Sequence, residues 1–191
     1  MKSVLFAAAL AFAGTGAIAA PEKYSLDASH SQIVFTYNHV GFSTTYGMFS
    51  GFAGEIMFDQ EDPAASSVSV EMPVKSMITG WQARLGHFMS SDFFDAADDE
   101  MVSFTSTTIE VTGENTAMIT GDLMLNGMTK SVVLDAKMNK SGPNPVMGGK
   151  EWAGFDATAT VLRSDFGLGL YAPGISDEVE IMISIEAAKA E

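Results

Sequence analysis

The residues that could perform nucleophilic or acid–base chemistry are few, and one group lies near the start of the chain. Asp27, His30 and Ser31 supply a carboxylate, an imidazole and a hydroxyl, which are the residue types of a serine hydrolase. In a strand, however, adjacent side chains point to opposite faces, so His30 and Ser31 would not meet. No nucleophile-elbow pattern is present in the sequence. We therefore predict no hydrolase, and we expect His30 to form a structural hydrogen bond beside Asp27.

The second group is in "RLGHFMSSDFFD", which contains Arg84, one of two arginines, and His87, one of three histidines. Apolar residues here recur at three- and four-residue spacing, which predicts a short helix within 80–95: Trp81, Leu85, Phe88 and Met89. Arg84 and His87 would then lie on neighbouring turns of one face. Two interpretations fit this pattern. The helix is a plug with its polar residues in solvent and Arg84 paired to Asp92 or Asp95, or it is a ligand gate.

Metal and cofactor chemistry has little support in the sequence. The histidines His30, His39 and His87 have no carboxylate or histidine at a tight ligand spacing. The chain has no cysteine, its methionines are scattered, and it has no glycine-rich phosphate loop. We predict no catalytic residue, no metal site and no cofactor.

The elements that must position these residues are strands. Apolar residues alternate with polar ones along "SQIVFTYNHV", "SSVSVEM", "AGFDATATVLR" and "VEIMISIE", which predicts half-buried antiparallel strands. Asn126-Gly127 between two such runs indicates a tight hairpin, and we expect a loop over 139–150. About eight strands at short spacing, in an all-β chain, favour a closed barrel or a sandwich.

The first 19 residues are predicted to be a signal peptide. A basic start, an apolar run from Val4 to Ala13 and the small residues before Ala20 are typical of one. We expect cleavage after Ala19, export to the periplasm, and a single domain over 20–191. The formal net charge is −14, and removing Lys2 makes it more negative. Such a surface repels phosphate backbones, so we predict no nucleic-acid partner.

The chain contains many large apolar residues, including 13 phenylalanines and 13 methionines. A well-filled core accounts for it, because flexible methionine fills gaps. An adaptable cavity for a long apolar ligand accounts for it equally, because a barrel of about eight strands is wide enough for one small ligand. Composition does not separate these two interpretations.

Several motifs together resemble the YceI family of exported polyisoprenoid-binding proteins. In order, they are "YSLDASHSQIVFTYNHVGFSTTYGMFSGFAGEIMFD", "SMITGWQARLGHFMSSDFFD", "VSFTSTTIEV", "ITGDLMLNGMTKSVVL" and "GFDATATVLRSDFGL". The resemblance covers essentially all of 20–191. It implies a lipocalin-like barrel whose apolar pore holds an isoprenoid-type lipid, such as a polyprenyl carrier or an isoprenoid quinone, without enzyme activity. Leu85-Gly86 and Phe88 depart from the usual pattern of relatives, so the rim of the pocket is expected to differ.

The resemblance also suggests where the ligand binds. We expect Arg84 and His87 near the barrel mouth, beside the polar head of the lipid, with Arg163 and His39 as further candidates. Arg163 could instead tie down Asp165 in a turn. One of the two phenylalanines at 93–94 is expected to border the pore. The full predicted ligand-binding set is Phe35, Tyr37, His39, Phe42, Phe49, Phe52, Trp81, Arg84, His87, Phe88, Phe94, Phe104, Arg163 and Phe166.

Two other hypotheses remain at this stage. A fatty acid or fatty amide could occupy the same barrel, or the fold could serve an enzyme or a metal-handling protein. For partners, we expect a hydrophobic lipid; a transient contact with a membrane protein and a homodimer are both compatible with the sequence.

Overall fold

The fold is a single antiparallel sheet of ten strands. The computed structural model describes residues 20–191, so the predicted signal peptide lies outside the described residues. The strands are β1 (Glu22–Leu26), β2 (Gln32–His39), β3 (Ser43–Phe49), β4 (Ala53–Phe58), β5 (Ser67–Pro73), β6 (Met101–Gly113), β7 (Thr116–Leu125), β8 (Met128–Pro143), β9 (Glu151–Leu162) and β10 (Glu178–Lys189). The described residues contain one α-helix, α1 (Gln82–Phe88), and the 3-10 helices η1 (Ala28–His30), η2 (Pro63–Ala65), η3 (Val74–Ser76) and η4 (Arg163–Phe166). No helix in this part of the chain is both long and apolar enough to cross a membrane.

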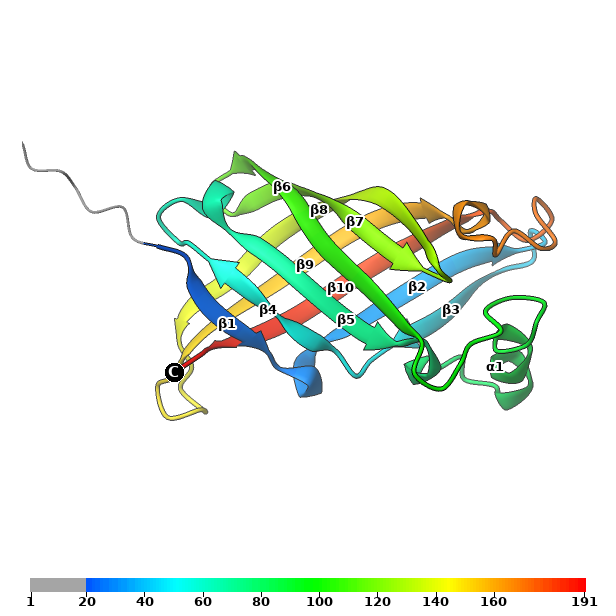
Figure 1. Ribbon diagram of the computed structural model, residues 1–191, viewed down its shortest axis with the longest axis horizontal. Coiled ribbons are helices and arrows are strands. Elements are labelled where there is room, and N and C mark those ends of the chain that lie inside the picture. The colour runs from blue at the N-terminus through cyan, green and yellow to red at the C-terminus, as the bar shows by residue number, and fades with distance from the viewer. Residues whose placement is uncertain (1–19) are drawn as a thin grey trace, which may run out of the picture.

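The sheet closes on itself because β1 pairs with both β4 and β10. Two pairs of strands each fill one position around the ring. Strands β1 and β2 both pair with β10, at its two ends, while β4 pairs with β1 and β3 with β2. The ten strands therefore occupy eight positions, and the predicted closed antiparallel barrel of about eight strands is confirmed (Figure 1).

The two shared positions, one filled by β1 and β2 and the other by β3 and β4, are each interrupted at a site that the local sequence explains. Asp27 caps η1 between β1 and β2, its side chain accepting a hydrogen bond from the Ser29 backbone amide. Between β3 and β4 the chain turns at Gly51, whose φ of 71° lies in the region that favours glycine. The segment at His30 is thus a 3-10 turn and not the strand that we expected.

The predicted alternation along the strands places apolar residues inside the barrel. Ile33, Phe35 and Tyr37 of β2 border its interior, as do Ile181 and Ile183 of β10. The Asn126-Gly127 hairpin is also confirmed, with φ values of 51° and 69° at its two central residues, as a tight turn of the mirror-image type requires.

The predicted short helix within 80–95 is confirmed as α1, and one strand boundary differs from the prediction. The helix ends at Phe88, because the chain then folds into turns in which the backbone amides of Phe93 and Asp95 both donate to the Ser90 carbonyl. Strand β8 continues to Pro143, past a bulge after Met138, by pairing with the start of β9. The predicted loop over 139–150 is therefore confined to 144–150.

The two ends of the barrel differ in how they are covered. Figure 1 shows α1 and the segment after β9 at one end, together with the β2–β3 and β7–β8 turns. The β4–β5 connection and the β6–β7 turn lie at the other end (Figure 1). We call these the helix end and the open end.

Gly121 of β7 gives a prediction about stability. A Cβ atom there would lie 2.3 Å from the Phe104 ring and 2.6 Å from the Thr105 carbonyl oxygen. Gly121→Ala should therefore lower the free energy of unfolding by about 2–3 kcal/mol through overpacking, measured by urea denaturation. Gly86→Ala on α1 is the control, because a Cβ there meets nothing within 4 Å, and it should raise stability by about 0.5–1 kcal/mol. Equal effects of the two substitutions would contradict this account of Gly121.

Candidate functional site

The barrel interior contains two apolar chambers. The outer chamber has a volume of about 240 Å³ and extends toward the open end, between β4–β5, β6–β8 and β9–β10. The inner chamber has a volume of about 170 Å³ and extends toward the helix end. Together they fall within the size range of small-molecule sites, about 300–1,000 Å³.

The two chambers share three apolar lining side chains, and we call this boundary between them the waist. Ile33 of β2, Leu123 of β7 and Ile181 of β10 border both chambers. Each comes from the inward face of its strand; β2 and β10 are neighbouring strands, and β7 lies across the ring from them. The two chambers therefore adjoin at these residues and together form one pore.

Seven of the predicted aromatic ligand-binding residues border the pore. Phe52 and Phe104 line the outer chamber. The inner chamber is lined by five more, namely Phe35, Tyr37, Phe49, Phe88 and Phe94. Phe93 also lines the inner chamber, so both adjacent phenylalanines border the pore, although we expected only one to do so.

Arg163 also lines the inner chamber, and it is 9% exposed. Its Nε donates to the Ser176 carbonyl at 2.8 Å, its Nη2 to Ile175 at 2.9 Å, and its Nη1 to Leu170 at 2.7 Å and also to Leu168. Burial lowers the pKa of this guanidinium, and the charge of Asp177 partly opposes that effect. Arg163 thus fixes the segment after η4 through backbone carbonyls, and the predicted tie to Asp165 is replaced by these four bonds.

The other predicted residues lie outside the two chambers. Phe42, at the β2–β3 turn, is 88% exposed and Trp81 is 64% exposed. His39 ends β2 in an exposed position, bridged to Ile175. Phe166, at 1% exposed, packs in a core cluster with Val161 and Leu168.

Arg84 and His87 are held by local contacts at the helix end. The Arg84 Nη1 donates to the Thr79 carbonyl at 3.1 Å, and its guanidinium carbon lies 6.0 Å from the centre of the Trp81 ring. The His87 Nε2 lies 3.0 Å from an Asp92 carboxylate oxygen. Asp92 thus pairs with His87 and not with Arg84. Neither residue borders a chamber, so a contact with the lipid head remains a prediction.

Many lining residues were missing from the predicted set because they are aliphatic. They include Ile56, Val68, Val70, Ile109, Val132, Leu134, Ala136, Met138, Val179 and Ile185. Their signal was the period-two alternation of their strands, which identifies an inward face without telling whether that face borders a cavity or a solid core.

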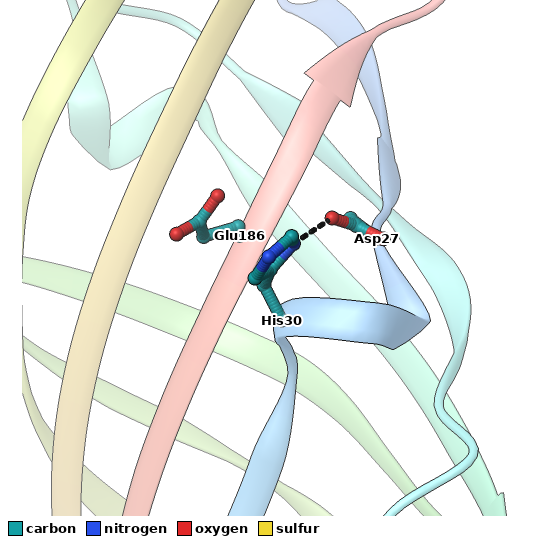
Figure 2. A group of neighbouring side chains, drawn as sticks. All are labelled: Asp27, His30 and Glu186. Carbon is teal, nitrogen blue, oxygen red and sulfur yellow. Dashed lines mark hydrogen bonds and ion pairs between the residues drawn. The ribbon is translucent and has the colours of Figure 1, made fainter. Parts of the chain in front are cut away.

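A polar cluster of Asp27, His30 and Glu186 lies on the barrel surface (Figure 2). The His30 Nδ1 lies 2.6 Å from an Asp27 carboxylate oxygen, which confirms the predicted structural hydrogen bond. One ligand-type atom from each of the three lies within 4.8 Å of the others. Glu186, however, already accepts from the Trp152 indole at 2.8 Å, and Asp27 from Ser29. In this cluster Asp27 therefore caps η1, and Glu186 of β10 holds the Trp152 side chain of the neighbouring strand β9.

The Asp27–His30 pair predicts a pH-dependent stability. Its hydrogen bond lowers the pKa of the Asp27 carboxyl and raises the pKa of the His30 imidazole. The Asp27 contribution is present above the usual carboxyl pKa and is lost as pH falls through the lowered value. The His30 contribution is present below the usual imidazole pKa and is lost as pH rises through the raised value. The pair therefore stabilises most between about pH 4 and about pH 6.5.

His30→Gln should accordingly lower Tm more at about pH 5.5 than at about pH 8.5, measured by thermal unfolding monitored by circular dichroism. The control is His39→Gln, which removes an exposed imidazole at the end of β2 and should show no such difference. An equal loss of Tm at both pH values in His30→Gln would contradict the pairing.

Comparison of the sequence with known proteins finds a family and a relative that each match most of the chain. Residues 24–187 match the YceI-like domain family. A UPF0312 protein of Ectopseudomonas mendocina is 38% identical over 191 residues, covering 99% of this chain and 99% of that protein.

Solved structures share the barrel. The crystal structure of the Campylobacter jejuni YceI protein has a TM-score of 0.71 at 28% identity, over 81% of this chain and 90% of that one. A polyisoprenoid binding domain from Saccharophagus degradans has a TM-score of 0.64 at 15% identity, over 87% and 98% of the two chains. The second likeness is one of fold alone.

Proposed function

The chain belongs to the YceI-like family, and from this premise we propose that it binds one lipid with an isoprenoid-type tail inside the barrel. The observation that carries the proposal is the pore of two joined apolar chambers. Its inner chamber is bordered by apolar side chains apart from Tyr37 and Arg163. Such a space suits a long hydrocarbon and little else, because a polar ligand would lose its hydration without gaining partners.

The affinity would come mainly from the tail. Each buried methylene contributes about 0.8 kcal/mol, so ten buried carbons supply about 8 kcal/mol before ordering costs. A branched isoprenoid tail fits a pore whose wall is built of large, adaptable side chains such as Phe49, Phe104 and Met72. The Saccharophagus degradans domain with this fold is described as polyisoprenoid binding, which supports the same ligand class here.

We place the protein in the periplasm, with 1–19 as a cleaved signal peptide, and assign it a role in transport or storage of a polyprenyl carrier or an isoprenoid quinone. A sequestered tail lets such a lipid leave a bilayer and cross water. Handing it to a membrane protein requires only a transient contact.

Native mass spectrometry of protein purified from its own bacterium, followed by organic extraction and lipid analysis, tests this proposal. We expect an isoprenoid at about one per chain. A straight-chain acid or amide would move the ligand to the fatty class. Protein that carries no lipid and fails to take up an isoprenoid added in vitro would contradict the proposal.

A further inference from the structure

The pore has one polar rim, and it lies at the open end. Apart from Asp156 on β9, the exposed residues that line the outer chamber come from the β4–β5 connection and the β6–β7 turn: Gln60, Pro63, Ser67, Val111, Gly113, Glu114, Asn115 and Thr116. The residues that line the inner chamber are all buried or half-buried. The solvent-facing mouth of the pore is therefore between these two segments, which lie side by side because η2 contacts β6.

The mouth is acidic. The two segments, 59–67 and 111–117, contain Asp59, Glu61, Asp62 and Glu114 and no lysine, arginine or histidine. The Asp59 carboxylate is fixed there by the backbone amides of Glu61 and Asp62, each at 2.9 Å. Glu114 itself lines the chamber, and none of the described residues lining it is basic.

The lysines of β8 nearest the mouth do not face it: Lys137 points to the outer surface, and Lys140 borders a separate surface pocket with His30 and Gly142. Lys137 of β8 pairs with Thr116 and with Asp156. It alternates with Ala136 and Met138, which line the chamber, so its side chain belongs to the outer face. Its charge acts on the Asp156 carboxyl. It therefore offers no counter-charge inside the rim.

The rim nevertheless offers hydrogen-bonding groups. Gln60 and Asn115 supply amide donors and acceptors, and Ser67 supplies a hydroxyl. These groups suit a small oxygen-bearing head such as a hydroxyl, amide or quinone carbonyl. They do not neutralise a phosphate, which is bound elsewhere in proteins by arginine, lysine or arrays of backbone amides.

We infer that the lipid enters tail first through this acidic mouth and that the mouth selects an uncharged, hydrogen-bonding head group over a phosphate or diphosphate head. The inference rests on the proposed function and narrows its ligand class. With the tail in the pore, the head lies at the rim formed by Gln60, Glu114 and Asn115. This rim is at the opposite end of the barrel from α1 (Figure 1), so the inference replaces the earlier expectation that Arg84 and His87 contact the head. An anionic head there faces several carboxylates with no compensating cation, and like charges placed together lower affinity.

Two probes with the same tail, farnesol and farnesyl diphosphate, test the selection. Each is titrated against the full mature chain by displacement of a fluorescent apolar probe, at low and at high salt. We expect farnesol to bind at least about tenfold more tightly at low ionic strength, and the gap to narrow with salt, because exposed charges are screened. Equal or tighter binding of the diphosphate would overturn the inference and leave the proposed function standing. Failure of both probes to bind would overturn the proposed function as well.

A pair of matched variants tests whether the charge at the rim causes the discrimination against the diphosphate head. Glu114→Lys reverses one charge at the rim, in the β6–β7 turn. Glu110→Lys makes the same change on the outward face of β6, between the lining residues Ile109 and Val111. Farnesyl diphosphate should bind at least about fivefold more tightly to Glu114→Lys at low salt and change less than about twofold for Glu110→Lys. Farnesol should bind both variants like the parent chain. Equal gains for the two variants would show a general charge effect and contradict a selective mouth.

Discussion

Replacing Arg163 with methionine is expected to lower the free energy of unfolding by about 3–5 kcal/mol. The guanidinium is buried, and its four hydrogen bonds all go to carbonyls of the segment between η4 and β10. Methionine has a similar length but no donor, so these carbonyls would lose their partners. The segment would have to open to rehydrate them, which also exposes Leu168 and Phe166, now 4% and 1% exposed.

The other arginine of the chain is the natural control. Arg84 donates one bond to the Thr79 carbonyl and is only half-buried, so Arg84→Met should cost less than about 1 kcal/mol. Both variants are compared with the parent by urea denaturation without ligand. Similar losses for the two would contradict the structural role given to Arg163. None of the five ion pairs found in residues 20–191 includes an arginine, so hydrogen bonding and not ion pairing sets this difference.

The second large effect is expected at the waist of the pore. Leu123→Trp would fill the passage between the two chambers, so a long tail could reach only the outer one. If about four methylenes are kept out of the inner chamber, the loss is about 3 kcal/mol, or about 100-fold in the affinity for geranylgeraniol. Geraniol, which is half as long, should be affected much less.

The neighbouring residue Met124 provides the matched control, because it is 40% exposed and points to the opposite face of β7. Met124→Trp should leave the affinity for both alcohols unchanged. Urea denaturation separates blocking from unfolding, since overpacking alone costs about 1–3 kcal/mol. Equal weakening of the short and long alcohols by Leu123→Trp would contradict a pore that runs through the waist.

The inward faces of the strands were predictable from the sequence, and the breaks in the strands were not. Alternation directly encodes which side of a strand is apolar, so Ile33, Phe35 and Tyr37 were placed correctly on one face. The position shared by β1 and β2 is interrupted by a 3-10 turn that Asp27 caps, and its last residue, His30, contacts the Asp27 carboxylate. The spacing of this pair predicted the hydrogen bond but not the turn.

The candidate site was predictable only in part. The predicted ligand-binding set consisted mainly of aromatic residues, and seven of these border the pore. Phe42 and Trp81 are instead exposed, and Phe166 is packed in a core cluster. The partners of Arg163 are all backbone carbonyls, which leave no signature in residue types. The mouth joins two segments about fifty residues apart in the sequence, 59–67 and 111–117. Their meeting depends on the closure of the barrel and so could not be inferred from either segment alone.

A crystal structure of the protein with bound geranylgeraniol tests the central claim most directly. We predict one molecule per chain, with its hydroxyl at the rim near Gln60 and Asn115. Its tail should pass between Ile33 and Leu123 into the inner chamber. Density for the alcohol on the outer surface only, or a pore that stays empty at saturating alcohol, would contradict the account.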